Sequence, residues 1–220
     1  MHFILFTLFS SIEVIAMFAI MFALFRFEYP FYHANVLFIA LMMSFVSFSL
    51  RYGLDLTNYS TLIHFLLLIF FFSLLYRQHI FYSAIAVTIS FVIYGLIQLV
   101  IIGGLVLFNV MNSSDIERAF SIQGMAIQSI SVTVAMLLYL GIKRYNKGFS
   151  FLPHTNRISI QWTSINTSIL VLIVFSIGLI GFMYYYFNIN NYSGYYLLSS
   201  ILLFLLVYLL YLSMRKDKTL

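Results

Sequence analysis

Four polar side chains stand inside long apolar stretches of the sequence, where they could bind a ligand or an ion. Glu13, His64, Gln98 and Gln128 are each surrounded by residues that are almost all hydrophobic. An acidic residue at the centre of a membrane-spanning helix costs on the order of 2.5–3.5 kcal/mol to insert, so it usually faces other protein. We therefore expect Glu13 to face the interior of a helix bundle. It is either satisfied by one neighbouring helix or takes part in binding.

His64 follows Ser60 and Thr61 by one helical turn. At the same depth as Gln98 and Gln128, it could line a polar cavity together with Glu13, although a lone histidine is often a hydrogen-bonded structural residue. We predict Glu13, His64, Gln98 and Gln128 as the ligand-binding residues. The cavity that they line should be open to the outside.

No pattern in the sequence predicts catalysis, a metal site or a cofactor. Cysteine is absent, and no HExxH pair or cluster of carboxylates offers a ligand set for a metal ion. The glycine pair Gly103-Gly104 is not followed by the lysine of a phosphate-binding loop. No Ser/His/Asp set can be assembled at one depth, so we expect a protein that is not an enzyme.

The composition of the chain shows what kind of structure must position the four polar residues. Of the 220 residues, 63% are hydrophobic and only 8% are charged, and the mean hydropathy is +1.04. A soluble domain is nearer half apolar and one quarter charged, so we predict a protein that uses the lipid bilayer as its solvent. The net charge of +5 comes from a few basic residues between the apolar stretches, which argues against a nucleic-acid partner.

Apolar stretches of bilayer-spanning length indicate seven transmembrane helices in a single all-α, polytopic domain covering residues 1–220. The brief connections favour antiparallel neighbours in one bundle. The expected spans are 3–25, 35–50, 59–76, 80–108, 120–142, 163–187 and 195–213.

The basic residues give an orientation, because cytoplasmic loops carry an excess of Lys and Arg. With the C-terminus inside, only Arg51 and Arg118 are external. The nine others are cytoplasmic: Arg26, Arg77, Lys143, Arg144, Lys147, Arg157, Arg215, Lys216 and Lys218. We therefore expect a multi-pass protein of the bacterial plasma membrane, with the N-terminus outside.

Two further patterns leave alternatives open. Small or polar residues form one-sided stripes on the fourth and fifth spans, which are either helix-packing seams or part of a site. The link between Lys143 and Trp162 contains Phe149, Phe151 and Leu152. It is either a segment lying at the membrane interface or an ordinary loop.

Ser113-Ser114-Asp115-Ile116-Glu117 resembles a helix start, with Ser114 as the cap.

Several short stretches together resemble the membrane sensor region of Gram-positive quorum-sensing receptor histidine kinases of the accessory-gene-regulator type. They are Phe9-Ser10-Ser11-Ile12-Glu13, Arg51-Tyr52-Gly53-Leu54, Ser60-Thr61-Leu62-Ile63-His64, Gln98, Ser113–Glu117 and Lys143-Arg144-Tyr145-Asn146. The resemblance implies a membrane bundle that detects a secreted peptide and signals to a kinase part. No phospho-accepting histidine helix or ATP-binding domain follows within these residues, so we expect a kinase-less homologue or an excised sensor domain.

Two functions are therefore expected from the sequence. The first is a receptor-like sensor module that detects an extracellular peptide or amphiphile and signals through a homodimer, a cytoplasmic partner or a further domain. The second is a small transporter subunit that binds a substrate, or an immunity protein against a membrane-active peptide. Seven spans with a basic C-terminal end favour the first.

Overall fold

The computed structural model describes residues 2–27, 33–54, 56–108, 122–145, 148–152, 162–187 and 192–218, and their regular structure is entirely helical. The elements are α1 (His2–Leu24), α2 (His33–Phe48), the π-helical turn η2 (Ser49–Gly53), α3 (Thr57–Leu75), α4 (Ile80–Leu107), α6 (Ile122–Arg144), α7 (Ser164–Phe187) and α8 (Tyr192–Asp217). The all-helical prediction is confirmed. The predicted helix start at Ser113–Glu117 lies outside the described residues.

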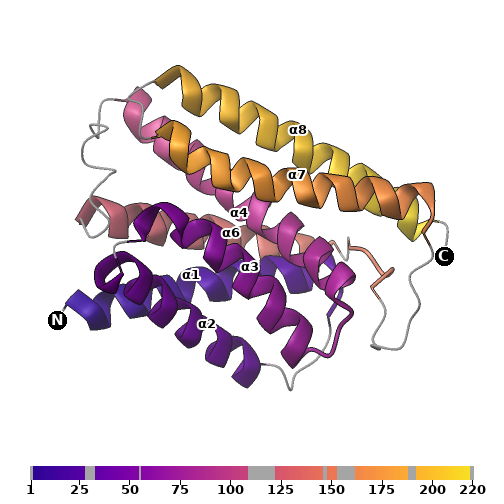
Figure 1. Ribbon diagram of the computed structural model, residues 1–220, viewed down its shortest axis with the longest axis horizontal. Coiled ribbons are helices and arrows are strands. Elements are labelled where there is room, and N and C mark those ends of the chain that lie inside the picture. Colours follow the sequence, from indigo (N-terminus) through magenta and orange to yellow (C-terminus); the bar gives the residue numbers. More distant parts are fainter. Residues whose placement is uncertain are drawn as a thin grey trace.

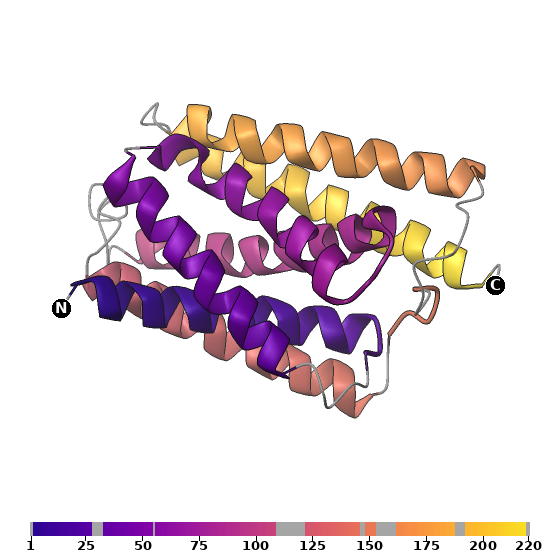
Figure 2. The same cartoon turned by 60° about the horizontal axis from the view of Figure 1, so that its bottom comes forward.

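Helix α4 lies in the middle of the bundle and packs against α1, α3, α6, α7 and α8. The other helices surround it, with α1, α2 and α6 on one side and α7 and α8 on the other (Figures 1 and 2). Its 28 residues are 80–107, a length of about 42 Å at 1.5 Å per residue. This exceeds the roughly 30 Å hydrocarbon core of a bilayer, so the central helix must tilt or project beyond it.

Six helices in the described part of the chain are long and apolar enough to cross a membrane, and α3 contains a shorter apolar stretch, Tyr59–Leu75. For α2 this length depends on η2, because the apolar segment Ala34–Gly53 continues through the π-helical turn. The structure thus has the helices of a membrane bundle at the predicted positions.

Two of the helices end in the same way, with an arginine in the left-handed conformation. Arg26 and Arg77 both have φ of 51°. The chain then turns back, so that Phe27 N donates to Phe22 O at 3.0 Å and Gln78 N donates to Ser73 O at 3.1 Å. These bonds satisfy carbonyl groups that a helix end leaves open. The positive charges also oppose the negative end of each helix dipole.

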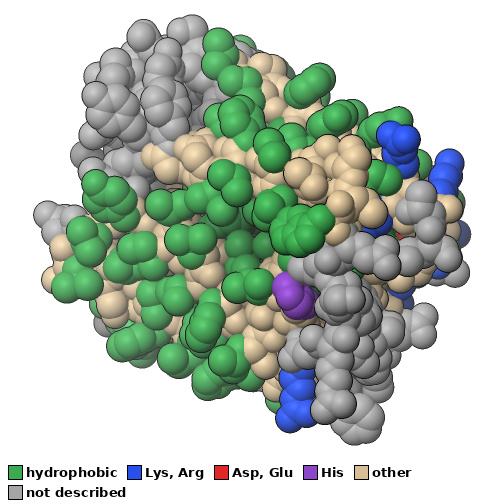
Figure 3. Space-filling model, turned by 45° about the vertical axis from the view of Figure 1, so that its right-hand side comes forward, with side chains coloured by type: hydrophobic (Ala, Val, Ile, Leu, Met, Phe, Trp, Pro, Cys, Tyr) green, Lys and Arg blue, Asp and Glu red, His purple; other side chains and the backbone are tan. Residues whose placement is uncertain are grey.

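Charge is concentrated at one end of the molecule. The ends of α1, α3, α6 and α8 that lie there carry seven of the eight Lys and Arg residues of the described chain: Arg26, Arg77, Lys143, Arg144, Arg215, Lys216 and Lys218. The face in Figure 3 is mainly hydrophobic away from this basic end. Large apolar side chains such as Val100, Leu137 and Phe204 are exposed on the helices, as expected for surfaces that contact lipid.

Residues 148–152, here called the docking segment, join three helices at the basic end. Phe149 N donates to Leu24 O of α1 at 2.6 Å. Ser150 donates to Asp217 Oδ1 of α8 from its backbone N (2.7 Å) and from its Oγ (3.0 Å). Phe151 lies 5.0 Å from the Lys216 ammonium, which also lies over two aromatic rings at the start of α4.

The interface interpretation of this link stays a prediction, but protein covers its apolar residues in the docking segment. Phe149, Phe151 and Leu152 are buried against the bundle, with both phenyl rings next to Phe25, the residue directly after α1. Apolar residues at this depth can be covered by lipid headgroups or by protein, and here protein covers them. Trp162, by contrast, is exposed, which suits a membrane-interface position.

Candidate functional site

A cavity of about 260 Å³ lies between the helices. Its lining comes mainly from α1, η2, α3, α4 and α6, and its polar side chains are Ser10, Glu13, Ser47, Arg51, Ser60, Thr61, His64, Tyr94, Gln98 and Gln128. All four residues predicted from the sequence are in this set. The structure therefore brings Glu13, His64, Gln98 and Gln128 to one cavity, and each comes from a different helix.

The cavity reaches the end of the bundle opposite the docking segment. Its lining includes Phe6 near the start of α1, Ser60 near the start of α3 and Arg51 in η2, where α2 ends. Along α1 it extends to Met17, a depth of about 16 Å at 1.5 Å per residue.

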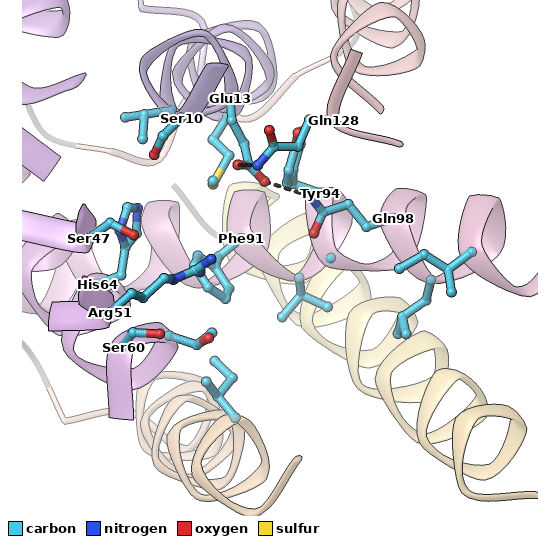
Figure 4. Close-up of a pocket in the computed structure, with 18 of the residues that line it drawn as sticks. Ser10, Glu13, Ser47, Arg51, Ser60, His64, Phe91, Tyr94, Gln98 and Gln128 are labelled. Carbon is cyan, nitrogen blue, oxygen red and sulfur yellow. Dashed lines mark hydrogen bonds between the residues drawn. The ribbon is translucent and has the colours of Figure 1, made fainter. Parts of the chain in front are cut away.

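Glu13 is the centre of the first polar group in the cavity. Gln98 Nε2 of α4 donates to Glu13 Oε1 at 2.6 Å, and Gln128 Nε2 of α6 donates to Glu13 Oε2 at 3.4 Å (Figure 4). The Tyr94 hydroxyl is directed at the same carboxyl group, but its geometry falls short of a hydrogen bond. Both carboxyl oxygens of Glu13 thus have an amide donor from a neighbouring helix.

Helix geometry explains why these three residues meet. Ser10, Met17, Ile20 and Met21 share a face of α1 with Glu13, and all four are buried. That face packs against both α4 and α6. Ser90 and Tyr94 precede Gln98 on the buried face of α4, while Ser131 and Ala135 follow Gln128 on α6. The one-sided stripes of small and polar residues on α4 and α6 therefore pack these helices against their neighbours, and they also place two amides beside Glu13.

Arg51 and His64 form the second polar group, on the other side of the cavity (Figure 4). Ser47 and Ser60 lie beside them, and the Ser60 hydroxyl donates to Thr57 O at 2.7 Å. The Arg51 guanidinium lies 5.9 Å from the centre of the Phe6 ring. Its Nε atom is buried and has no hydrogen-bond partner. The guanidinium is within electrostatic range of Glu13, yet no ion pair joins the two side chains within the described structure.

Sequence reasoning missed Arg51 as a site residue, because it follows the second apolar stretch and looked like part of an external loop. The π-helical turn η2 instead continues α2 by five residues, Ser49–Gly53, and directs the guanidinium into the bundle (Figure 4). The only signal in the sequence was a lone basic residue at the end where basic residues are otherwise scarce.

No family model, curated protein or solved structure matches the chain. The site must be interpreted from its own geometry. Between the two polar groups the lining is apolar, with Phe91, Val92 and Ile102 of α4 among its members. Apolar walls with a few converging polar groups are typical of small-molecule sites, although 260 Å³ is just below their usual range of about 300–1,000 Å³.

No group of three or more His, Asp or Glu residues that could hold a metal ion is found within the described residues. Within the described part of the chain, Glu13 is the one acidic residue in the cavity lining. The arrangement is suited to non-covalent recognition. It offers a cation, a histidine and hydroxyl groups on one side, an amide-bonded carboxyl group on the other, and apolar walls between them.

Proposed function

We propose that the protein is a non-enzymatic, receptor-like membrane sensor whose bundle cavity binds part of an extracellular peptide or amphiphile. The observation that carries this proposal is the convergence of Glu13, His64, Gln98 and Gln128 on one cavity inside an apolar bundle. Polar groups in a bilayer are costly unless they are paired or functional. Here they come from four helices, so a bound molecule would contact several helices at once, and a change in their spacing would carry the signal.

The proposed topology has seven spans, with the N-terminus outside and the C-terminus in the cytoplasm of a bacterium. Its support is the basic end of the bundle, since basic residues gather on the cytoplasmic side. The cavity reaches the opposite end, which would then be extracellular. The signal would pass at the basic end to a partner protein, to a second copy of the chain, or to a further domain in a longer protein.

Alkaline phosphatase fusions test this topology, because the enzyme is active only outside the cytoplasm. A fusion after Lys218 should be inactive, and a fusion after Asn191, between the last two spans, should be active. Activity of the Lys218 fusion would contradict the orientation and with it the extracellular opening of the cavity.

Absence of cysteine from the chain allows a direct test of the cavity. Ser47→Cys places one thiol in the cavity lining, whereas Ser176→Cys is a matched control, because Ser176 is fully buried in α7 and does not line the cavity. Intact cells are treated with a membrane-impermeant maleimide. Ser47→Cys should be labelled and Ser176→Cys should not. Labelling of Ser47→Cys only after permeabilisation would refute an extracellular site.

A further inference from the structure

Two charged side chains line the cavity, and they differ in whether the protein satisfies them. Glu13 accepts hydrogen bonds from Gln98 at 2.6 Å and from Gln128 at 3.4 Å. Arg51 has a buried Nε atom without a hydrogen-bond partner. Its guanidinium lies 5.9 Å from the centre of the Phe6 ring, which offers it no hydrogen-bond acceptor oxygen. The unmet need in the cavity is therefore an acceptor with negative charge at Arg51.

A bilayer makes this need larger than it would be in water. A guanidinium stays charged at any ordinary pH and offers five N–H donors in a planar fork that matches a carboxylate. The Arg51 side chain is partly exposed but its Nε atom is buried, and a hydrogen bond to a charged group contributes about 1.5–3 kcal/mol. Among the described residues, no acidic side chain other than Glu13 lines the cavity, and Glu13 forms no ion pair with Arg51 among the described contacts.

We propose that the cavity binds a carboxylate that carries a compact apolar group, with the carboxylate at Arg51 and the apolar group against Phe91 and Val92. This assignment rests on the proposed ligand-binding function and specifies its ligand. The side chains beside Arg51 fit it, because Ser60 and His64 offer further polar contacts there (Figure 4).

Volume limits the size of the bound group. At about 30 Å³ for each water-sized unit, 260 Å³ holds about nine such units. A whole peptide does not fit, but its C-terminal residue does, and so does a short fatty acid. Both present the same chemistry to Arg51, a free carboxylate next to an apolar chain.

The test uses the full chain with Ser47→Cys in lipid nanodiscs and measures the rate of maleimide labelling in the presence of four probes. Hexanoate and a tripeptide ending in leucine with a free carboxylate represent the two sources of the carboxylate. Hexanamide and the same tripeptide with an amidated end are the uncharged controls. We expect a carboxylate to protect the thiol, and the matching amide to need a roughly ten- to hundredfold higher concentration.

Arg51→Gln should abolish the difference between acid and amide, while Arg51→Lys should retain part of it, because it keeps the charge and loses the planar fork. Arg77→Gln, at the opposite end of the bundle, is the matched control and should behave as wild type. Protection by the peptide acid alone identifies a peptide C-terminus as the ligand, and protection by hexanoate identifies a fatty acid.

Equal protection by acid and amide, or an acid preference that persists in Arg51→Gln, would overturn the assignment. A thiol that is labelled from outside but protected by none of the probes would also overturn the assignment. That outcome would not contradict the proposed receptor function. A thiol that cannot be labelled from outside in intact cells would instead remove the receptor function itself. Chromatographic behaviour of each variant shows whether it has folded.

Discussion

Replacing Gly148 with alanine should loosen the docking segment and destabilise the whole bundle. A Cβ atom built on Gly148 would lie 2.8 Å from Leu24 O and 2.9 Å from Ala23 O, and 3.0 Å from Arg26 Cγ. Two of these three atoms belong to the backbone of α1, which cannot turn aside as a flexible side chain could. The segment must therefore move away from α1.

The cost can be estimated from what the movement disturbs. The bond from Phe149 N to Leu24 O, 2.6 Å long, contributes about 0.5–1.5 kcal/mol. Forcing extra atoms into a close-packed contact costs about 1–3 kcal/mol. Complete loss of the buried Phe149, Phe151 and Leu152 contacts would cost more, about 1.5–3 kcal/mol for each side chain, but a shift of a few tenths of an ångström retains most of that burial. Because the bond from Phe149 N lengthens without breaking, the overpacking term dominates, and we expect a loss of about 1–3 kcal/mol.

Thermal unfolding of the purified protein in one detergent is a suitable assay, with folded protein measured by size-exclusion chromatography after heating. For a chain of this size each kcal/mol shifts the melting temperature by about 2–4 °C, so Gly148→Ala should melt about 2–12 °C below wild type. Gly141→Ala is the matched control, since nothing lies within 4 Å of a Cβ atom at that helical position. It should melt at or slightly above the wild-type temperature, because alanine is favoured over glycine in a helix.

Equal melting of Gly148→Ala and wild type would refute the reasoning. It would mean that the close approach of the docking segment to α1 contributes nothing to stability. A similar loss in Gly141→Ala would show that the assay reports glycine replacement in general rather than this contact.

Two further experiments test the packing of α1, one at Glu13 in the cavity and one at its contact with α2. Glu13→Gln should accumulate in membranes as wild type does, because an amide can still hydrogen-bond to Gln98. Glu13→Lys should accumulate poorly, because it puts a second cation near Arg51 in a low-dielectric site. Quantitative immunoblotting of membranes measures the amount of each variant, and equal amounts would contradict an interior position of Glu13. Ser11 Oγ and Ser44 Oγ lie 3.0 Å apart between α1 and α2, and a double-mutant cycle with alanine should give a coupling of about 0.6 kcal/mol in thermal stability. A coupling near zero would mean that this pair does not hold the two helices together.

Most of the fold could be predicted from the sequence, because a bilayer-spanning helix needs a long apolar stretch that is easy to recognise. The predicted span 59–76 and the helix Thr57–Leu75 differ by two residues at the start and one at the end. The apolar interior of the bilayer also made the site partly predictable. A polar side chain such as Glu13 or Gln98 in an apolar stretch must face protein, and in a small bundle only a limited interior is available for it.

Arg51 could not be predicted as part of the site, for a physical reason. A basic residue after an apolar stretch is compatible with a loop, with the headgroup region and with a cavity, and the choice depends on whether the helix continues. The helix does continue here, through the π-helical turn Ser49–Gly53. The docking segment was ambiguous in the same way, because Phe149 and Phe151 could be buried by lipid or by protein.

The cavity and the docking segment are connected by two continuous helices. On α1, Glu13 lies eleven residues before Leu24, and on α4, Tyr82 lies sixteen residues before Gln98, distances of about 16 and 24 Å. A ligand that changes the spacing of α1 and α4 at the cavity also changes it where the docking segment and α8 meet them, unless the helices bend or pivot about that contact. We therefore expect Gly148→Ala, which alters that far contact, to change the affinity of the cavity for a carboxylate probe, since coupling between two sites is reciprocal. Labelling protection of Ser47→Cys in both backgrounds measures this, and an unchanged affinity would show that the two ends of the bundle move independently.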